Sequence, residues 1–190
     1  MNRTSRYYRK RIIVFGFEGK NNKTETNYFS HFKPTDDRYI LKCISCGVTD
    51  PVNMISSIKK KRKDLDYNAR EDLTFIFVDE DCDSTKRETI DNLQSKQPKD
   101  IVIIRSRPCF ELWFLNHFCV TTKEYGNNTE LILDLKKFIA NYNKNNDYFD
   151  ILKSSKDTAI KNSLLQKEKE NPRTSTDVVD IVDKVVKFKD

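Results

Sequence analysis

The chain has 190 residues, 34% of them charged and 37% hydrophobic, which excludes global disorder and allows one domain with a buried core. Lysine and arginine number 35 against 29 acidic residues, and the resulting net charge of +6 suits a polyanionic partner without specifying one. No apolar run approaches the roughly 20 residues of a membrane span, so we expect no membrane association.

The five cysteines are odd in number, and no secretory signal precedes them. This pattern predicts free thiols and a reducing, cytoplasmic location. Cys43 and Cys46 form a Cys-x-x-Cys motif that lacks a second pair at zinc-finger spacing, so a metal or redox role is not favoured there.

Four apolar runs predict strands, at residues 11–17, 39–44, 74–78 and 101–104 in chain order. The first, third and fourth are expected to be buried on both faces, as in a parallel sheet covered by helices. The segments between them carry helix signals: Thr24 before the apolar Tyr28, Phe29 and Phe32, the Asp50-Pro51 N-cap pair, and the capping box Thr85-x-x-Glu88. Alternating strands and helices predict βαβ units and right-handed crossovers.

Two helical segments have unusual composition. Residues 59–63 are five consecutive basic residues, which indicates a solvated helix face or, less often, a contact for a phosphate backbone. Residues 108–118 are apolar nearly all round, which predicts a central helix. Glu111 is the one acid in it, and burying a carboxylate is costly unless it is paired or bound to a metal. His117, six positions later, points to another face and is expected to be a core residue.

Beyond residue 120 the sequence predicts helices and no further strand, with the last helix at about 176–188. We therefore expect an α/β fold with a doubly wound, mostly parallel, Rossmann-like sheet of about four strands. Residues 1–120 would form this core, and residues 121–190 would form a helical C-terminal appendage packed on it.

Acidic residues follow two of the predicted strands. Glu18 ends the first, and Asp79 and Asp81 end the third. In a sheet of order 2-1-3-4 these strands are neighbours, so the three carboxylates would converge at the carboxyl edge, with Glu80 pointing the other way. Carboxylate oxygens suit Mg²⁺ or Mn²⁺, and three of them can bind the ion and supply a general base. The alternative is a solvated acidic loop that only begins the next helix.

Other chemistries lack their residues. A P-loop would need Gly-x-x-x-x-Gly-Lys-Ser/Thr, and the segment 16–21 is too short and has no hydroxyl after Lys20. No Gly-x-Gly-x-x-Gly occurs, and neither His31 nor His117 neighbours a nucleophile motif.

Taken together, the motifs resemble the RloB-like family. The resemblance rests on strand-Glu18-Gly19, the segment 23–29, Asp79-x-Asp81, the segment 106–118 with its Cys-Phe-Glu-Leu-Trp block, and Asn-Pro-Arg-Thr at 171–174. It implies a TOPRIM-type protein linked to bacterial restriction and phage-defence loci, in which Glu18, Asp79 and Asp81 bind Mg²⁺ and cleave nucleic-acid phosphodiesters. Two departures are about two extra residues at 20–23, and Arg107 where the family tends to have Asn.

From these features we expect a metal-dependent endonuclease that acts in antiphage defence by abortive infection, on RNA such as tRNA rather than on DNA. Glu111 would be an auxiliary ligand or positioning residue, and Lys20, Lys23 and Arg107 would contact phosphates. The alternatives are a non-catalytic nucleic-acid- or partner-binding module, and a toxin subunit silenced by another protein. A defence-system partner and a homo-oligomer are both compatible with this prediction.

Overall fold

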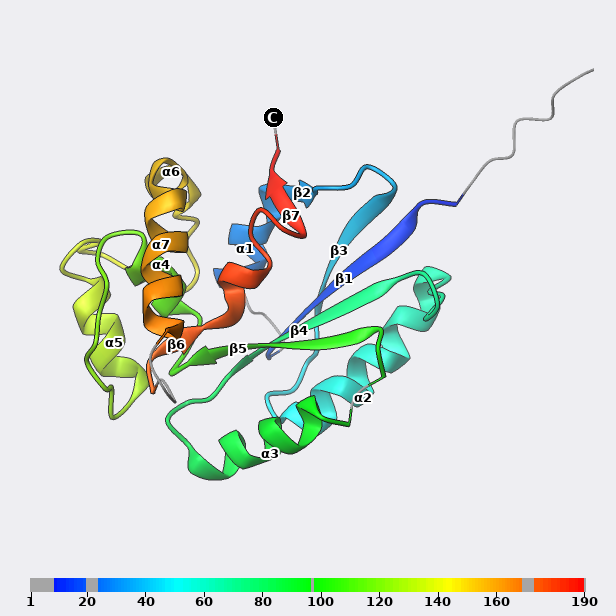
Figure 1. Cartoon of the computed structure of the whole chain (residues 1–190), viewed down its shortest axis with the longest axis horizontal. Helices are drawn as coiled ribbons and strands as arrows, with labels where there is room; N and C mark the ends of the chain where they lie inside the picture. Colours follow the sequence, from blue (N-terminus) through cyan, green and yellow to red (C-terminus); the bar gives the residue numbers. More distant parts are fainter. Residues whose placement is uncertain (1–8, 20–23, 97, 169–172, 190) are drawn as a thin grey trace, which may run out of the picture.

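The computed structural model describes residues 9–19, 24–96, 98–168 and 173–189, and in these parts the chain forms a layered α/β structure (Figure 1). A five-stranded sheet has the order β3-β1-β4-β5-β6. Its strands are β1 (Arg11–Phe17), β3 (Tyr39–Ser45), β4 (Leu73–Asp79), β5 (Ile101–Arg107) and β6 (Ser175–Thr176). The first four are parallel, and β6 is antiparallel to β5.

The four parallel strands are the four predicted from apolar runs, and the predicted order 2-1-3-4 is confirmed as β3-β1-β4-β5. In the register, Phe15 of β1 lies between Cys43 of β3 and Phe75 of β4. β1 and β4 are therefore neighbours at the centre of the sheet, and their carboxyl ends lie side by side. The fold is the expected mostly parallel, Rossmann-like α/β architecture.

Alternate residues of the central strands enter two separate hydrophobic clusters, one on each face of the sheet. Phe15 and Phe77 belong to the larger cluster, whereas Val14 and Ile76 belong to the smaller one. This alternation follows from the two-residue period of a strand. Both faces are therefore buried, as the continuous apolar runs predicted.

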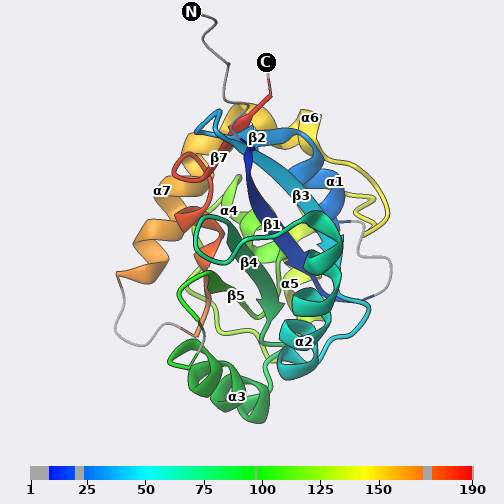
Figure 2. The ribbon, with the colours of Figure 1, turned by 90° about the vertical axis from the view of Figure 1, so that its right-hand side faces the viewer.

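Helices cover both faces. α2 (Pro51–Lys61), followed by the 3-10 turn η1 (Arg62–Leu65), and α3 (Ser84–Gln94) lie on one side (Figures 1 and 2). On the other side lie α1 (Thr24–Ser30), α4 (Glu111–Asn116) and most of the C-terminal part of the chain.

Capping explains where two of these helices begin. The Asp50 side chain accepts a hydrogen bond from the Asn53 backbone N–H, and Pro51 occupies the first helical position as predicted. The cap of α3 differs from the prediction. Asp83, not Thr85, is the N-cap residue, and its carboxylate accepts from the backbone N–H of Thr85 and of Lys86.

The predicted central helix is present but short. α4 begins at Glu111 and ends at Asn116, and each of its six residues is buried. Leu112 and Trp113 are fully buried in the larger cluster. His117 follows it, and it is a core residue as predicted, at 2% exposed.

The C-terminal part is not purely helical, so the prediction that strands stop at residue 120 is wrong. It contains α5 (Asn128–Leu135), α6 (Phe149–Leu152), η2 (Lys153–Ser155), α7 (Lys156–Lys167), β6, η3 (Asp177–Asp180) and β7 (Val186–Phe188). β6 extends the central sheet. β7 pairs with β2 (Phe32–Pro34), so Phe32, which was predicted on the first helix, lies on a strand instead.

The predicted last helix is also wrong, and its apolar residues explain why. Five of them are buried in the larger cluster. Val178 and Val179 lie in the 3-10 turn η3, Val186 lies in β7, and Ile181 and Val182 lie between these two elements. β-branched residues favour extended structure when a distant strand offers a pairing partner. The boundary at residue 120 stays a prediction, although both parts contribute to the same cluster. Within the described segments, no helix has the length and apolar character needed to cross a membrane.

Candidate functional site

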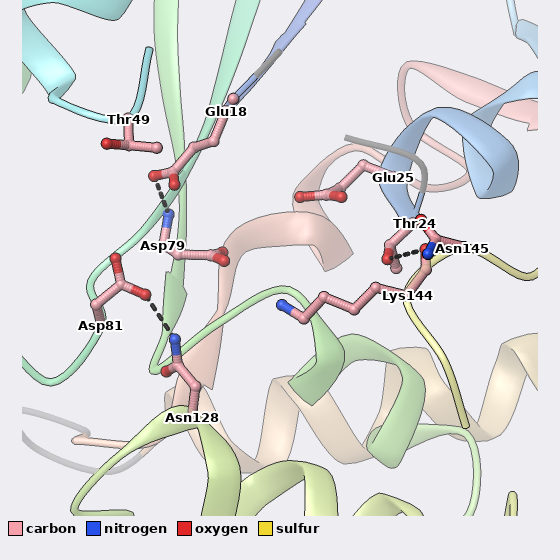
Figure 3. Close-up of a pocket in the computed structure, with 10 residues that line it drawn as sticks. Glu18, Thr24, Glu25, Thr49, Asp79, Asp81, Asn128, Lys144 and Asn145 are labelled. Atoms are coloured by element: carbon pink, nitrogen blue, oxygen red, sulfur yellow. Dashed lines mark hydrogen bonds between the residues drawn. The ribbon is translucent and has the colours of Figure 1, made fainter. Parts of the chain in front are cut away.

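A cavity of about 490 Å³ lies at the carboxyl edge of the sheet (Figure 3). We call it the acidic pocket, and its lining residues are Glu18, Gly19, Thr24, Glu25, Thr49, Asp79, Asp81, Asn128, Lys144 and Asn145. The three acids predicted at the strand ends therefore lie together. Glu18 follows β1, Asp79 ends β4, and Asp81 lies two residues further on.

The three acids are connected by hydrogen bonds and by a lysine. The backbone N–H of Asp79 donates to Glu18 Oε1 over 3.2 Å. Lys86 Nζ lies 3.0 Å from Glu18 Oε1 and 2.6 Å from Asp81 Oδ2. Asn128 of α5 donates its Nδ2–H to Asp81 Oδ1 over 2.6 Å. A cation thus already neutralises part of the charge of Glu18 and Asp81.

The chain turns sharply after β4, which determines where the acids point. Asp81 and Cys82 have φ of 55° and 58°, in the left-handed region that non-glycine residues seldom adopt. Asp79 Oδ1 accepts a hydrogen bond from the backbone N–H of Phe110, just before α4. The hydrogen bond from Phe110 therefore holds the Asp79 side chain toward α4. After the turn, the Asp81 side chain points toward Asn128 of α5.

Burial and like charge act on these carboxylates together. The pKa of Asp79 is raised well above its usual value, first by burial and then by Glu25, Glu18, Glu111 and Asp81. Burial also raises the pKa of Glu18, although the Lys86 ammonium opposes the shift. The pKa of Lys86 is itself raised, because the two carboxylates outweigh the lowering caused by its burial.

Two charged residues that line the acidic pocket, Glu25 and Lys144, were not predicted as site residues. Glu25 of α1 is buried and points toward Asp79 from the opposite wall, and Lys144 reaches in beside it (Figure 3). Glu25 lies in the segment 23–29 on which the family resemblance rests, so a signal existed. Lys144 had none, because it comes from an asparagine-rich loop distant in sequence. Thr24 Oγ1 donates to the Lys144 carbonyl over 2.9 Å and fixes that loop.

Glu111 lies behind the wall of the acidic pocket. Its Oε1 lies 2.9 Å from Lys144 Nζ and accepts the Tyr142 hydroxyl over 3.0 Å. The structure therefore connects Glu111 to the pocket through Lys144. Its role as auxiliary ligand stays a prediction.

The carboxylates in and behind the acidic pocket have the negative charge that a hard divalent cation needs, but their positions in the structure do not form a metal site. Glu18, Glu25, Asp79, Asp81 and Glu111 carry five carboxylates, and with Lys86 and Lys144 their formal charge is −3. In the described residues, however, no three His, Cys, Asp or Glu side chains are placed to hold a metal ion. Binding at Glu18 and Asp81 would require the Lys86 ammonium to move, because like charges repel at this distance.

Of the three phosphate contacts predicted from the sequence, the described one, Arg107, does not line the acidic pocket. Arg107 lies on the other side of the β4 end, where its Nε is 2.7 Å from Glu80 Oε1. It lines a second cavity of about 340 Å³, which we call the arginine pocket. Lys20 and Lys23 lie outside the described residues.

The side chains of His117, Cys43 and Cys46 are all uncharged near neutral pH. Burial lowers the pKa of His117 to about 4, so this side chain is neutral near pH 7. Cys43 and Cys46 are both free thiols, and burial raises the pKa of each, to about 11 and about 12. Neither thiol would be ionised at neutral pH.

Comparison with known proteins adds a family to this geometry. No curated protein and no solved structure matches the chain. A family model described as RloB-like protein matches residues 12–185, which include β1 with Glu18, the end of β4, and the block around α4. With nearly its whole length matched, the chain belongs to the RloB-like protein family.

Proposed function

We propose that the chain is a divalent-metal-dependent nuclease of TOPRIM type that cleaves nucleic-acid phosphodiesters. The observation that carries the proposal is the convergence of Glu18, Asp79 and Asp81, with Glu25, in one pocket at the carboxyl edge of a parallel sheet. Open α/β sheets bind their ligands at this edge. The surplus of negative charge there is what a divalent cation would neutralise.

The residues of the acidic pocket divide into three roles in this proposal. Glu18, Asp79 and Asp81 would hold Mg²⁺ or Mn²⁺, which lowers the pKa of a bound water and neutralises charge on a phosphate. Glu18, whose pKa burial raises above its usual value, would also accept a proton from the attacking water. Lys144, half-exposed and directed into the pocket, would contact a non-bridging phosphate oxygen of the substrate.

Cleavage of a labelled single-stranded RNA oligonucleotide, with Mn²⁺ or with EDTA, tests the proposal. Glu18→Gln keeps the size of the side chain and removes its charge, so cleavage should fall by the roughly 10²–10⁴-fold that general-base catalysis supplies. Glu88→Gln, an exposed acid on α3, is the control and should cleave like the wild type. Equal rates for Glu18→Gln and wild type would show that the acidic pocket is not the active site.

The biological part of the proposal is an antiphage role by abortive infection, with RNA such as tRNA as the substrate. It rests on the family resemblance and on the small size of the chain, which suits a folded RNA better than a clamp on duplex DNA. Sequencing the new RNA ends in cells that express the protein tests it, with Asp79→Asn as the inactive comparison. New ends confined to the wild type would support RNA cleavage, and their absence would contradict it.

A second candidate function is a non-catalytic nucleic-acid-binding module. The observation that favours it is Lys86, which occupies Glu18 and Asp81 as an internal counter-ion. The two candidates differ in their need for metal. A module binds the oligonucleotide equally well in EDTA and in Mn²⁺ and never cuts it, whereas the nuclease cuts only with metal.

A further inference from the structure

The arginine pocket is a cavity that the proposed reaction does not use. Its lining residues are Glu80, Cys82, Ser84, Arg87, Arg107, Pro108, Glu124, Tyr125, Gly126 and Arg173. It lies on the side of the β4 end to which Glu80 points, opposite to Asp79 and Asp81. It also differs from the acidic pocket in charge, because arginines replace carboxylates as its main charged groups.

Three arginines surround one carboxylate at the base of this pocket. Glu80 is 1% exposed, and its oxygens lie 3.1 Å from Arg87 Nε, 3.3 Å from Arg105 Nε and 2.7 Å from Arg107 Nε. Arg105 is shared with Asp91, 2.6 Å away. Among the described side chains of this group, three arginines face two carboxylates. Glu80 also fixes the guanidinium planes, so they are ordered before any ligand arrives.

Arg173 adds a fourth guanidinium at the rim. It is paired with Glu124 over 3.0 Å, and both side chains are largely exposed. Because an exposed ion pair contributes little free energy, Arg173 can exchange Glu124 for another anion at small cost. Pro108 and Tyr125 supply an apolar wall between the charged groups.

The two pockets share a wall. Asp81 lines the acidic pocket and its neighbour Cys82 lines the arginine pocket; likewise Asn128 lines the first and Gly126 the second. Hydrogen bonds join these segments, from Asn128 to Asp81 and from Cys82 Sγ to the Tyr125 carbonyl over 3.2 Å. A nucleic-acid strand bound in one pocket therefore needs to cross only this shared wall to reach the other pocket.

We propose that the arginine pocket binds a phosphate group of the same nucleic-acid strand whose neighbouring phosphodiester lies in the acidic pocket. Guanidinium groups present parallel N–H donors that match phosphate oxygens, which lysine cannot do. The subsite would hold the strand by its backbone, without reading its sequence. This assignment rests on the proposed function for the identity of the ligand, but the phosphate chemistry of the pocket is independent of cleavage.

The test uses the double variant Arg87→Gln/Arg173→Gln of the full chain in EDTA. Glu80 keeps Arg105 and Arg107 in this variant, so its buried charge stays paired. The matched control is Arg38→Gln/Arg70→Gln, which removes the same charge from two exposed positions away from the pocket. Circular dichroism melts confirm that both variants fold.

Inorganic phosphate is the first probe, and its binding is monitored by the NMR signals of backbone amides and arginine side chains. In the wild type, phosphate should shift the signals of Arg107 and Gly126, which every variant retains, and the double variant should lose these shifts while the control keeps them. Absence of shifts in the wild type, or equal shifts in the double variant, would overturn the assignment. Since no metal is present, a failed nuclease assay leaves this result unaffected.

A single-stranded RNA oligonucleotide is the second probe and distinguishes a strand from free phosphate. One lost phosphate contact should reduce the slope of log affinity against log salt by about 0.7 in the double variant and leave the control unchanged. Competition by inorganic phosphate should weaken oligonucleotide binding to the wild type and to the control, and not to the double variant. If the double variant keeps the wild-type slope although phosphate shifts the pocket signals of the wild type, the pocket binds free phosphate and not a strand. That outcome would overturn the strand assignment.

Discussion

Asp79 connects the fold to the site at the scale of a single residue. Its backbone N–H donates to Glu18 and its Oδ1 accepts from Phe110 N–H, so it holds the end of β4 against α4. The pKa of its carboxyl is raised, because the one hydrogen bond that the carboxylate accepts from Phe110 does not offset burial and the surrounding carboxylates. The ionised residue is therefore a local cost to stability at neutral pH, which a protein retains where function needs the charge.

Replacing Asp79 by Asn should remove that cost. A carboxyl whose pKa is raised in the fold stabilises below its unfolded pKa, near 3.8, and loses this contribution as the pH rises through the folded pKa. In EDTA, Asp79→Asn should therefore melt at or above the wild-type temperature at pH 7. Its advantage should disappear as the pH falls toward 3.8.

An exposed carboxylate provides the control for this measurement. Arg38 lowers the pKa of Asp36 to about 2, but this ion pair is exposed and screened by solvent, so Asp36→Asn should change the melting temperature little at either pH. A melting temperature for Asp79→Asn clearly below wild type at pH 7 would mean that the ionised carboxylate is well satisfied. The electrostatic argument for a cation site would then fail.

At the scale of elements, the contact between β1 and α2 depends on Gly16. A Cβ added there would lie 2.8 Å from Ile58 Cγ1 and 2.9 Å from Ile58 Cδ1, closer than packed carbon atoms allow. Ile58 is fully buried and β-branched, so its rotamer freedom is small. The helix therefore approaches the strand over a glycine, two residues before Glu18.

Gly16→Ala should destabilise the protein by about 1–3 kcal/mol, the usual cost of overpacking a core. Ile58→Val removes Cδ1, so the double variant should lose less stability than the sum of the two single changes. Urea unfolding of the three variants measures this coupling. Additive losses would show that the strand and helix separate freely, and that Gly16 is not a packing constraint.

How far the elements could be predicted depended on their length and on the distance to their partners. β1, β3, β4 and β5 have seven residues each, and their apolar runs were sufficient to locate them. β2, β6 and β7 have two or three residues and pair with strands far away in sequence, so no local pattern marks them. α4 lies where an apolar helix was predicted, but it ends two residues earlier, at Asn116, whose side chain bonds to Ser163 and Gln166 of α7.

At the scale of the whole molecule, the C-terminal part completes the acidic pocket. Asn128 of α5 and the loop carrying Lys144 and Asn145 close the side opposite Glu18 (Figure 3). The sequence located Glu18, Asp79 and Asp81 because strand ends of a parallel sheet converge by topology. It could not locate Lys144, since a loop more than 60 residues away reaches the pocket only through tertiary packing. For the same reason, the sequence predicted Arg107 as a phosphate contact beside the acids, although Arg107 lines the arginine pocket.

The basic run of α2 and η1 is held away from both pockets at its Arg62 end, whereas Lys61 reaches the Ser45 carbonyl at the carboxyl end of β3. Arg62 is 2.7 Å from Asp100 and donates to Thr74 Oγ1 over 3.0 Å, at the amino ends of β5 and β4. A seven-residue strand spans roughly 20 Å, which separates this end of the sheet from Asp79. Charges more than about 8 Å apart are largely screened at 0.15 M salt. These lysines therefore have the position of a solvated helix face.

Lys59→Gln/Lys60→Gln/Lys63→Gln should accordingly leave RNA affinity within about twofold of wild type at 0.15 M salt, and leave the cleavage rate unchanged. Lys61 is kept because its Nζ donates to the Ser45 carbonyl over 2.6 Å. Fluorescence anisotropy compares this triple variant with Arg87→Gln/Arg173→Gln, which removes fewer charges. If the triple variant binds RNA more weakly than the arginine variant, the substrate covers the amino end of the sheet. The assignment of the carboxyl edge as the active edge would then be wrong.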